Sequence, residues 1–289
     1  MKRIWAPAKI NRIIASLIVA ASTTTACQTT QPQSPADKPP ATQTTTAPAR
    51  PAANEPALDP VIDKILTRLE QREITDLHAK CVWETVFVVT EDRERKIGEI
   101  WYRAEKPVAK FKVRFNRKIE GDEAKPLNEE HLFDGEWYIE LQSITKTVTR
   151  RQIRGPGDKT DPFKLGEGAF PVPFGQKKAD ILKEFDVALL PTGKKDPEKT
   201  DHIKLTPREG TRTRQSYETV EFWIAQEGDL AGLPIKVRAA KFDPTGAVNS
   251  YQTVEFSDVD LKAGVGASEF RIEPPPGYDV VEEKLLPQP

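Results

Sequence analysis

Hydrophobic residues recur at the spacing of one helix face over residues 59–74. Steps of three and four residues bring side chains to one side of a helix, and the residues that follow this spacing are Ile62, Ile65, Leu66 and Leu69. Asp59 is placed to cap the first turn, and Pro60 fits within that turn, where its missing N–H is not needed. We therefore predict an amphipathic helix over residues 59–74.

After this helix the period of the pattern changes to two, which is typical of β-strands. The first strand is predicted over residues 81–89, in which one side carries Cys81, Trp83, Thr85, Phe87 and Val89. A polar turn then leads to a second strand over residues 98–103. The clearest alternation follows Pro107, with Phe111, Val113 and Phe115 on one side and Lys110, Lys112, Arg114 and Asn116 on the other.

Turn residues divide the rest of the chain into further strands and one more helix. Asp134-Gly135 predicts a hairpin between residues 131–133 and 137–141. Residues 155–175 are rich in Gly and Pro and are predicted to be irregular. Residues 177–190 are predicted to be helical, with Ile181, Leu182 and Phe185 on one face. The other predicted strands cover residues 144–153, 203–206, 217–225, 234–242 and 248–256, with a tight turn at residues 243–246.

These elements predict an α+β fold that is mainly β. About nine or ten long antiparallel strands must curl as they twist, so we expect a curled antiparallel half-barrel sheet. The helices come before the sheet and in its middle, and together they could cover its hollow side. We therefore predict a helical lid over an apolar cavity.

The N-terminal segment has the order of a secretory signal. Its positive start, formed by Lys2, Arg3, Lys9 and Arg12, precedes a short apolar run over residues 13–21. Cys27 follows a small residue, so we predict a lipoprotein-type signal peptide over residues 1–27, with Cys27 lipidated as the mature N-terminus. Thr24 departs from the usual lipoprotein pattern, which has Leu three residues before the cysteine. Cleavage after Ala21 by the ordinary signal peptidase therefore stays open.

The composition of residues 28–58 differs from that of the rest. This stretch is made mostly of Pro, Thr, Ala and Gln, which cannot bury enough apolar surface to offset chain entropy. We predict a disordered tether with a mean reach of about 30 Å. Residues 59–289 then form one domain, which is large enough to bury on the order of 70% of its unfolded surface.

Charge and candidate chemistry exclude several classes of function. The net charge is −1, so we expect no binding to nucleic acid. His78, His131 and His202 lie apart without metal-ligand spacing. Cys81 lies alone in an apolar run, where a buried inert thiol is favoured over a nucleophile. We predict no enzyme activity, no catalytic residue, no metal and no cofactor.

Several short motifs give the chain a resemblance to a known family. Residues 267–281 read ASEFRIEPPPGYDVV, and three further pieces agree in order: GEIW at 98–101, Asp134-Gly135 before an aromatic strand, and LTP at 205–207. In these motifs the chain resembles the LolA/LolB family of outer-membrane lipoprotein carriers, over nearly all of residues 59–286. The resemblance implies an open half-barrel that shelters acyl chains, and a role in moving lipids or lipoproteins across the periplasm without covalent chemistry.

The resemblance also implies a set of site residues. The expected ligand-cavity residues are Trp83, Phe87, Trp101, Tyr102, Phe111, Val113, Phe115, Trp137 and Trp223. The expected lid and latch residues are Ile65, Leu66, Leu69, Ile181, Leu182, Phe185 and Lys106. Lys106 stands where carriers of the family commonly have an arginine, and lysine cannot make the forked contact of that latch. The sequence does not decide which face of the sheet is concave, because a shift of one residue reverses every side chain.

The expected partners are acyl lipids or lipoproteins, donor and acceptor sorting proteins, and a membrane surface reached through the lipid on Cys27. The expected location is the periplasmic side of a bacterial envelope. Two alternatives stay open: a sensor that recognises lipoproteins and signals to a partner protein, and a structural envelope protein with a filled core. A basic cluster at residues 146–159 favours a solvated strand edge, and contact with anionic head groups or with an acidic partner stays open.

Overall fold

The computed structural model describes residues 58–285, except 107, 156–157, 159–161 and 164–173. Residues 60–289 form one compact unit, which contains all the described helices and strands. Its helices are α1 (Pro60–Gln71) and α2 (Lys178–Glu184). Its strands are β1 (Asp76–Phe87), β2 (Arg93–Arg103), β3 (Lys110–Glu120), β4 (Glu123–Phe133), β5 (Trp137–Gln142), β6 (Thr147–Gln152), β7 (Phe185–Leu190), β8 (Thr200–Pro207), β9 (Tyr217–Ala225), β10 (Pro234–Phe242), β11 (Val248–Asp260) and β12 (Asp279–Glu283).

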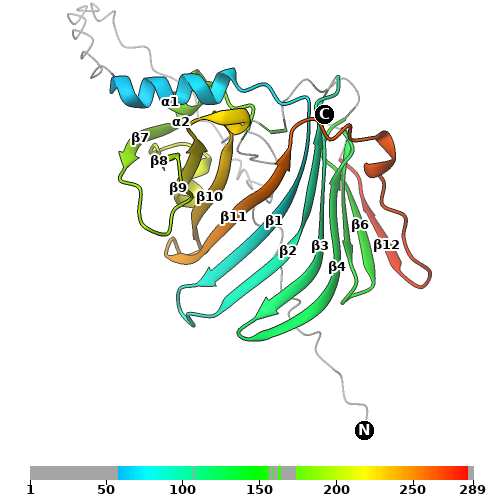
Figure 1. The fold of residues 1–289 in the computed structure, drawn as a ribbon. Coiled ribbons are helices and arrows are strands. Elements are labelled where there is room, and N and C mark those ends of the chain that lie inside the picture. The colour runs from blue at the N-terminus through cyan, green and yellow to red at the C-terminus, as the bar shows by residue number, and fades with distance from the viewer. Residues whose placement is uncertain (1–57, 107, 156–157, 159–161, 164–173, 286–289) are drawn as a thin grey trace, which may run out of the picture. The chain divides into compact units, whose positions relative to one another are not determined.

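All twelve strands belong to one sheet, in the order β12-β6-β5-β4-β3-β2-β1-β11-β10-β9-β8-β7. Every pairing is antiparallel except that of β12 with β6. Because β1 pairs with both β2 and β11, it joins two runs of consecutive strands into one surface. The sheet is strongly curled and open (Figure 1), so the predicted fold, mainly β with a curled sheet and two helices, is confirmed.

Several elements differ from the sequence prediction, which gave nine or ten strands where the structure describes twelve. β1 begins at Asp76 and β2 at Arg93, each five residues before its predicted start. β4 begins at Glu123, well before the predicted strand at residues 131–133, because its charged residues hide the alternation. The predicted helix over residues 177–190 ends at Glu184, and Phe185 adopts extended angles (φ −135°, ψ 149°) and starts β7. Pairing with β8 therefore overrides a weak helical pattern. β12 is not among the predicted strands; it covers only the end of the motif at residues 267–281, whose start forms the 3₁₀ turn Ala267–Glu269.

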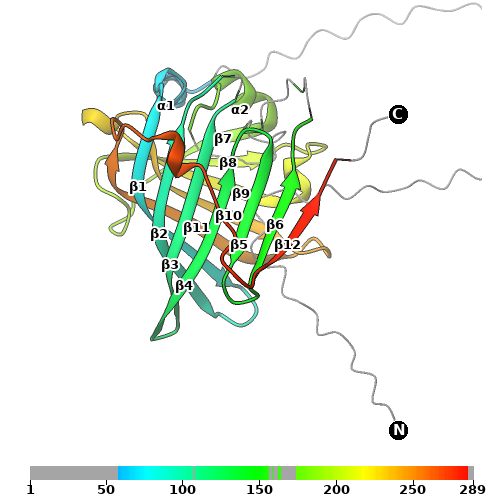
Figure 2. The same cartoon turned by 90° about the vertical axis from the view of Figure 1, so that its right-hand side faces the viewer.

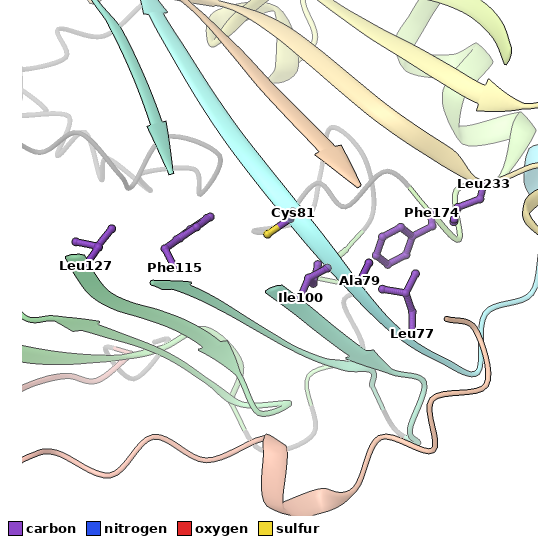
Figure 3. Close-up of a cluster of buried hydrophobic side chains, with 8 residues drawn as sticks. All are labelled: Leu77, Ala79, Cys81, Ile100, Phe115, Leu127, Phe174 and Leu233. Atoms are coloured by element: carbon purple, nitrogen blue, oxygen red, sulfur yellow. The ribbon is translucent and has the colours of Figure 1, made fainter. Parts of the chain in front are cut away.

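One face of the sheet, here the inner face, carries the larger apolar surface. Its centre is a cluster of Leu77, Ala79, Cys81, Ile100, Phe115, Leu127, Phe174 and Leu233 (Figure 3). Residues that lie opposite one another on neighbouring strands share a face of the sheet. By this pairing the inner face extends from Trp83 of β1 through β11, β10 and β9 to Ile203 of β8. Asp201, two residues before Ile203, lies on the same face and pairs with Arg68 of α1. The helix therefore contacts the inner face.

The opposite face, here the outer face, is covered over one half of the sheet by the C-terminal segment. Residues 261–278 run across β2–β5 (Figure 2) and complete a second cluster formed by Trp101, Leu132, Ile139, Leu141, Val148, Val265 and Phe270. Two cations hold the segment: Arg103 donates to the Val265 carbonyl at 3.1 Å and Lys112 to the Arg271 carbonyl at 3.0 Å. None of the described helices is long and apolar enough to cross a membrane.

Candidate functional site

The strand register divides the nine predicted cavity residues between the two faces. Six of them lie on the inner face: Trp83, Phe87, Tyr102, Phe111, Val113 and Phe115. The other three are tryptophans on the outer face, and each is covered by a cation. Arg114 lies 5.0 Å from the ring centre of Trp101, Arg150 5.0 Å from that of Trp137 and Lys236 4.7 Å from that of Trp223. Only the six inner-face residues can line a common site.

The inner face holds a group of five packed rings, here the aromatic cluster: Tyr102, Phe111, Phe133, Phe163 and Phe174. The Tyr102 and Phe174 ring centres are 5.0 Å apart, and Phe163 lies 5.5 Å from Phe133 and 6.0 Å from Phe111. The sheet contributes the first three residues. Phe163 and Phe174 come from the stretch predicted to be irregular. Its many Gly and Pro residues leave no periodic pattern, so the sequence does not predict that these two side chains belong to the site.

Next to the aromatic cluster, the inner face carries a buried polar chain, here the tetrad: Lys96, Glu129, His131 and Tyr138. Lys96 Nζ donates to both Glu129 carboxylate oxygens at 2.9 Å. His131 Nε2 lies 2.8 Å from Glu129 Oε1, and its Nδ1 lies 2.6 Å from the Tyr138 hydroxyl. All four residues are less than 9% exposed. Their mutual contacts compensate for the loss of water around two opposite charges.

The charges of the tetrad are set by burial and by the neighbouring groups. Burial raises the pKa of Glu129, but the hydrogen bonds and positive charge of His131 and Lys96 outweigh it and hold the pKa below its ordinary value of 4.5. Burial raises the pKa of Tyr138 well above 10. The tetrad therefore keeps an ionised carboxylate and a neutral phenol at the edge of an apolar surface. Residue spacing did not predict it, because its members come from three strands.

The predicted lid residues pack inward, as their spacing suggests. Ile65, Leu66, Leu69, Ile181 and Phe185 are buried, and Leu182 is half-buried. Phe185 reaches the core from β7 instead of from a helix. Two ion pairs fasten α1: Arg68 to Asp201 of β8, and Lys178 of α2 to Asp63. Lys106 is exposed and has no ion pair or hydrogen bond within the described part of the chain.

The remaining candidates for chemistry have structural partners. His78 lies 3.1 Å from Glu99 and His202 lies 2.9 Å from Glu221. Burial raises the pKa of the Cys81 thiol to about 12, so Cys81 remains a protonated thiol. Among the described residues, no group of three or more His, Cys, Asp or Glu side chains is arranged to hold a metal.

The basic cluster predicted at residues 146–159 is partly neutralised by the chain itself. Arg150 pairs with Glu282 at 3.1 Å and Arg151 with Glu283 at 2.6 Å, both in β12. Arg154 donates to the carbonyl oxygens of Gly135 and Asp158. Lys159, together with the predicted signal peptide, Cys27 and the tether, lies outside the described residues.

No family model and no curated protein matches the chain. Solved structures with similar folds include an uncharacterized conserved protein from Thermus thermophilus, at 12% identity and a TM-score of 0.42, covering 77% of this chain and 99% of that one. A LolA superfamily protein from Nitrosomonas europaea matches at 11% identity and a TM-score of 0.36, covering 73% of this chain and 97% of that one. MucB matches at 14% identity and a TM-score of 0.39, covering 76% of this chain and 63% of that one.

These neighbours include the superfamily that the sequence resembles. With identities of 11–14% and TM-scores below 0.5, they carry no argument about what this chain binds.

Proposed function

We infer that the chain binds acyl chains of lipids or lipoproteins on the inner face of its sheet, without covalent chemistry. The observation that supports this most directly is the aromatic cluster, in which Phe163 and Phe174 pack on the three rings of the sheet. Two side chains from outside the sheet thus cover an aromatic surface that could otherwise receive a ligand. The resemblance of the sequence to lipoprotein carriers agrees with this interpretation.

Acyl chains would bind by replacing these two rings. The contacts of Phe163 and Phe174 with the sheet are non-directional, so hydrocarbon can take their place with little loss. Each methylene removed from water contributes about 0.8 kcal/mol. An acyl chain of ordinary length therefore gains enough binding free energy to offset the exposure of two phenyl rings. The tetrad lies beside this surface, since the His131 and Phe115 rings are in contact, and its charged groups disfavour hydrocarbon there.

Access to the inner face would depend on α1 and on the ion pairs that fasten it. Lys178–Asp63 is partly exposed, and such a pair is worth about 0–1 kcal/mol; Arg68–Asp201 is less exposed. Most of the stability of the helix on the sheet therefore comes from its buried apolar side chains. A ligand that offers equivalent apolar contacts could loosen the helix at small cost.

In the cell, the proposed setting is the periplasmic side of the envelope. Export depends on the signal over residues 1–27, and lipidation of Cys27 would tether the domain to a membrane surface. A tethered domain with an acyl-binding face suits a carrier or receptor that takes lipoproteins from a donor and passes them to an acceptor.

The first test is native mass spectrometry of the full chain purified from membranes. We expect bound acyl lipid or lipopeptide, and uptake of a fluorescent fatty acid after its removal. Transfer of that fatty acid to acceptor vesicles would support a carrier, whereas tight retention would favour the sensor alternative. A protein that is empty and takes up no fatty acid would rule out acyl binding.

The second test separates the two faces of the sheet. Phe111→Asp places a charge inside the aromatic cluster and should reduce fatty-acid uptake at least tenfold. Trp137→Asp is the matched control, because it places the same charge on the outer face of the same half of the sheet, and it should keep uptake. Phe163→Ala should instead increase uptake by removing a competing ring. Equal uptake by all three variants, each with a native circular dichroism spectrum, would contradict the inner-face site.

A further inference from the structure

The last strand of the sheet is held differently from all the others. β12 (Asp279–Glu283) is five residues long, and all five residues are exposed. It pairs in parallel with β6 and with no other strand. Val280 and Val281 are 52% and 45% exposed, so the strand adds almost nothing to the core.

What joins β12 to β6 is backbone pairing and a match of charge. The register places Glu282 opposite Arg150 and Glu283 opposite Arg151, and both pairs form ion pairs at 3.1 and 2.6 Å. The hydrogen bond and negative charge of Glu283 raise the pKa of Arg151. Without β12, strand β6 would be a sheet edge with two adjacent arginines.

The chain just before β12 is fixed independently of it. Val265 and Phe270 are buried in the outer-face cluster, and Ile272 and Tyr278 pack against it. Gly277, with a φ of +80°, turns the chain after three prolines. β12 can therefore leave β6 while the segment over the outer face stays in place, since elements with few buried contacts open locally at low cost.

We propose that β12 occupies the edge of β6 as a replaceable strand, and that an acidic extended segment of a partner protein binds this edge in its place. Such a segment pairs its backbone with β6 and sets neighbouring carboxylates against Arg150 and Arg151. This is strand addition to a sheet edge, in which the backbone supplies affinity and the side chains supply selection. β12 itself is the template for the partner: two valines followed by two glutamates.

The free-energy cost of replacing β12 by a partner strand on the β6 edge is small. Both ion pairs have side chains that are more than a third exposed, and such pairs contribute little to stability. An incoming strand restores the same backbone pairing, so the cost of replacing β12 is small. The exchange does not depend on acyl binding at the inner face.

Hydrogen exchange on the full chain tests whether β12 opens. We expect the amide protons of β12 to exchange at least a hundredfold faster than those of β5, which lies one strand further in. Equal protection of β12 and β5 would mean that β12 is a permanent part of the sheet, and the proposal would fail.

Peptide binding tests the partner chemistry. The probe is a fluorescein-labelled peptide with the sequence of residues 277–285, and its anisotropy is followed with full-length variants. Glu282→Ala/Glu283→Ala weakens the internal strand and should bind the probe at least tenfold more tightly than the unchanged chain. The matched control, Glu120→Ala/Glu123→Ala, removes two exposed acids from the β3–β4 hairpin and should bind the probe like the unchanged chain.

A charge reversal completes the test. Arg150→Glu/Arg151→Glu, added to Glu282→Ala/Glu283→Ala, should abolish binding of the acidic probe and permit binding of a probe with both glutamates changed to lysine. Probe binding that is unchanged by the charge reversal in the chain and by that in the probe would overturn the proposal. A concentration-dependent dimer of the unchanged chain that disappears in Glu282→Ala/Glu283→Ala would also overturn it, in favour of a second copy as the occupant.

Discussion

At the residue scale, the tetrad is the group most sensitive to a single substitution. Glu129→Gln removes the carboxylate that contacts both Lys96 and His131 and takes from a buried ammonium its closest counter-charge. The Glu94 carboxylate, 3.8 Å from Lys96 Nζ, compensates the ammonium in part. We therefore expect the free energy of unfolding to fall by about 3 kcal/mol, at the low end for a broken buried pair, measured by urea titration. Glu227→Gln is the matched control in an exposed ion pair with Lys199, and it should cost no more than about 1 kcal/mol.

The Glu129 carboxylate also makes the free energy of unfolding depend on pH, in a direction that its pKa determines. The pKa of Glu129 is lower in the folded chain than its ordinary value of 4.5, so the unfolded chain takes up the proton first as pH falls. The stabilisation is complete above about pH 4.5 and is lost as pH falls through the folded pKa. The difference in unfolding free energy between the unchanged chain and Glu129→Gln should shrink below pH 4.5. A difference that stays constant from about pH 7 to about pH 3 would contradict this.

Lys241 of β10 should make the stability of the fold depend on pH in the alkaline range. Burial lowers its pKa from 10.5 to about 8, so the folded chain releases the proton before the unfolded chain does. Stability should therefore rise between about pH 8 and pH 10.5, by on the order of 3 kcal/mol relative to Lys241→Met. Urea titrations of both proteins across this range measure the effect, and parallel curves would argue against a buried ammonium.

At the element scale, the close approach of β2 and β3 depends on Gly98. A Cβ built on Gly98 would lie 1.9 Å from the carbonyl oxygen of Arg114 and 2.8 Å from the Cα of Phe115. The strands also change register at this position. Gly98→Ala must push the strands apart, and we expect it to lower the free energy of unfolding by about 3 kcal/mol. In Gly155→Ala the new methyl meets nothing within 4 Å, so stability should stay within about 1 kcal/mol.

At the scale of the whole molecule, the unit formed by residues 60–289 has its own core. Its clusters on both faces of the sheet are formed by residues within 60–289. A chain that lacks residues 1–57 should therefore unfold at the same urea midpoint, and with the same m-value, as the full chain. A lower midpoint would mean that the N-terminal part contributes to the fold.

Local pattern alone predicted much of this architecture. Period two identified β1, β3 and the β4–β5 hairpin, and helical spacing identified α1 within three residues at each end. These predictions hold because both periods depend only on backbone geometry and on which side chains avoid water. The same reasoning failed at residues 185–190, where six residues carry a helical pattern but pairing with β8 decides the structure.

Only the tertiary structure decided the composition of the site. Alternation divides a strand into two faces without saying which is inner, so Trp101, Trp137 and Trp223 were indistinguishable in sequence from Trp83 and Phe111. The tetrad, the aromatic cluster and the pairing of β12 with β6 join residues that are far apart along the chain. Sequence by itself determined the elements, because they rest on local periodicity. The register between distant strands decided which side chains meet, because a shift by one residue moves every side chain to the other face.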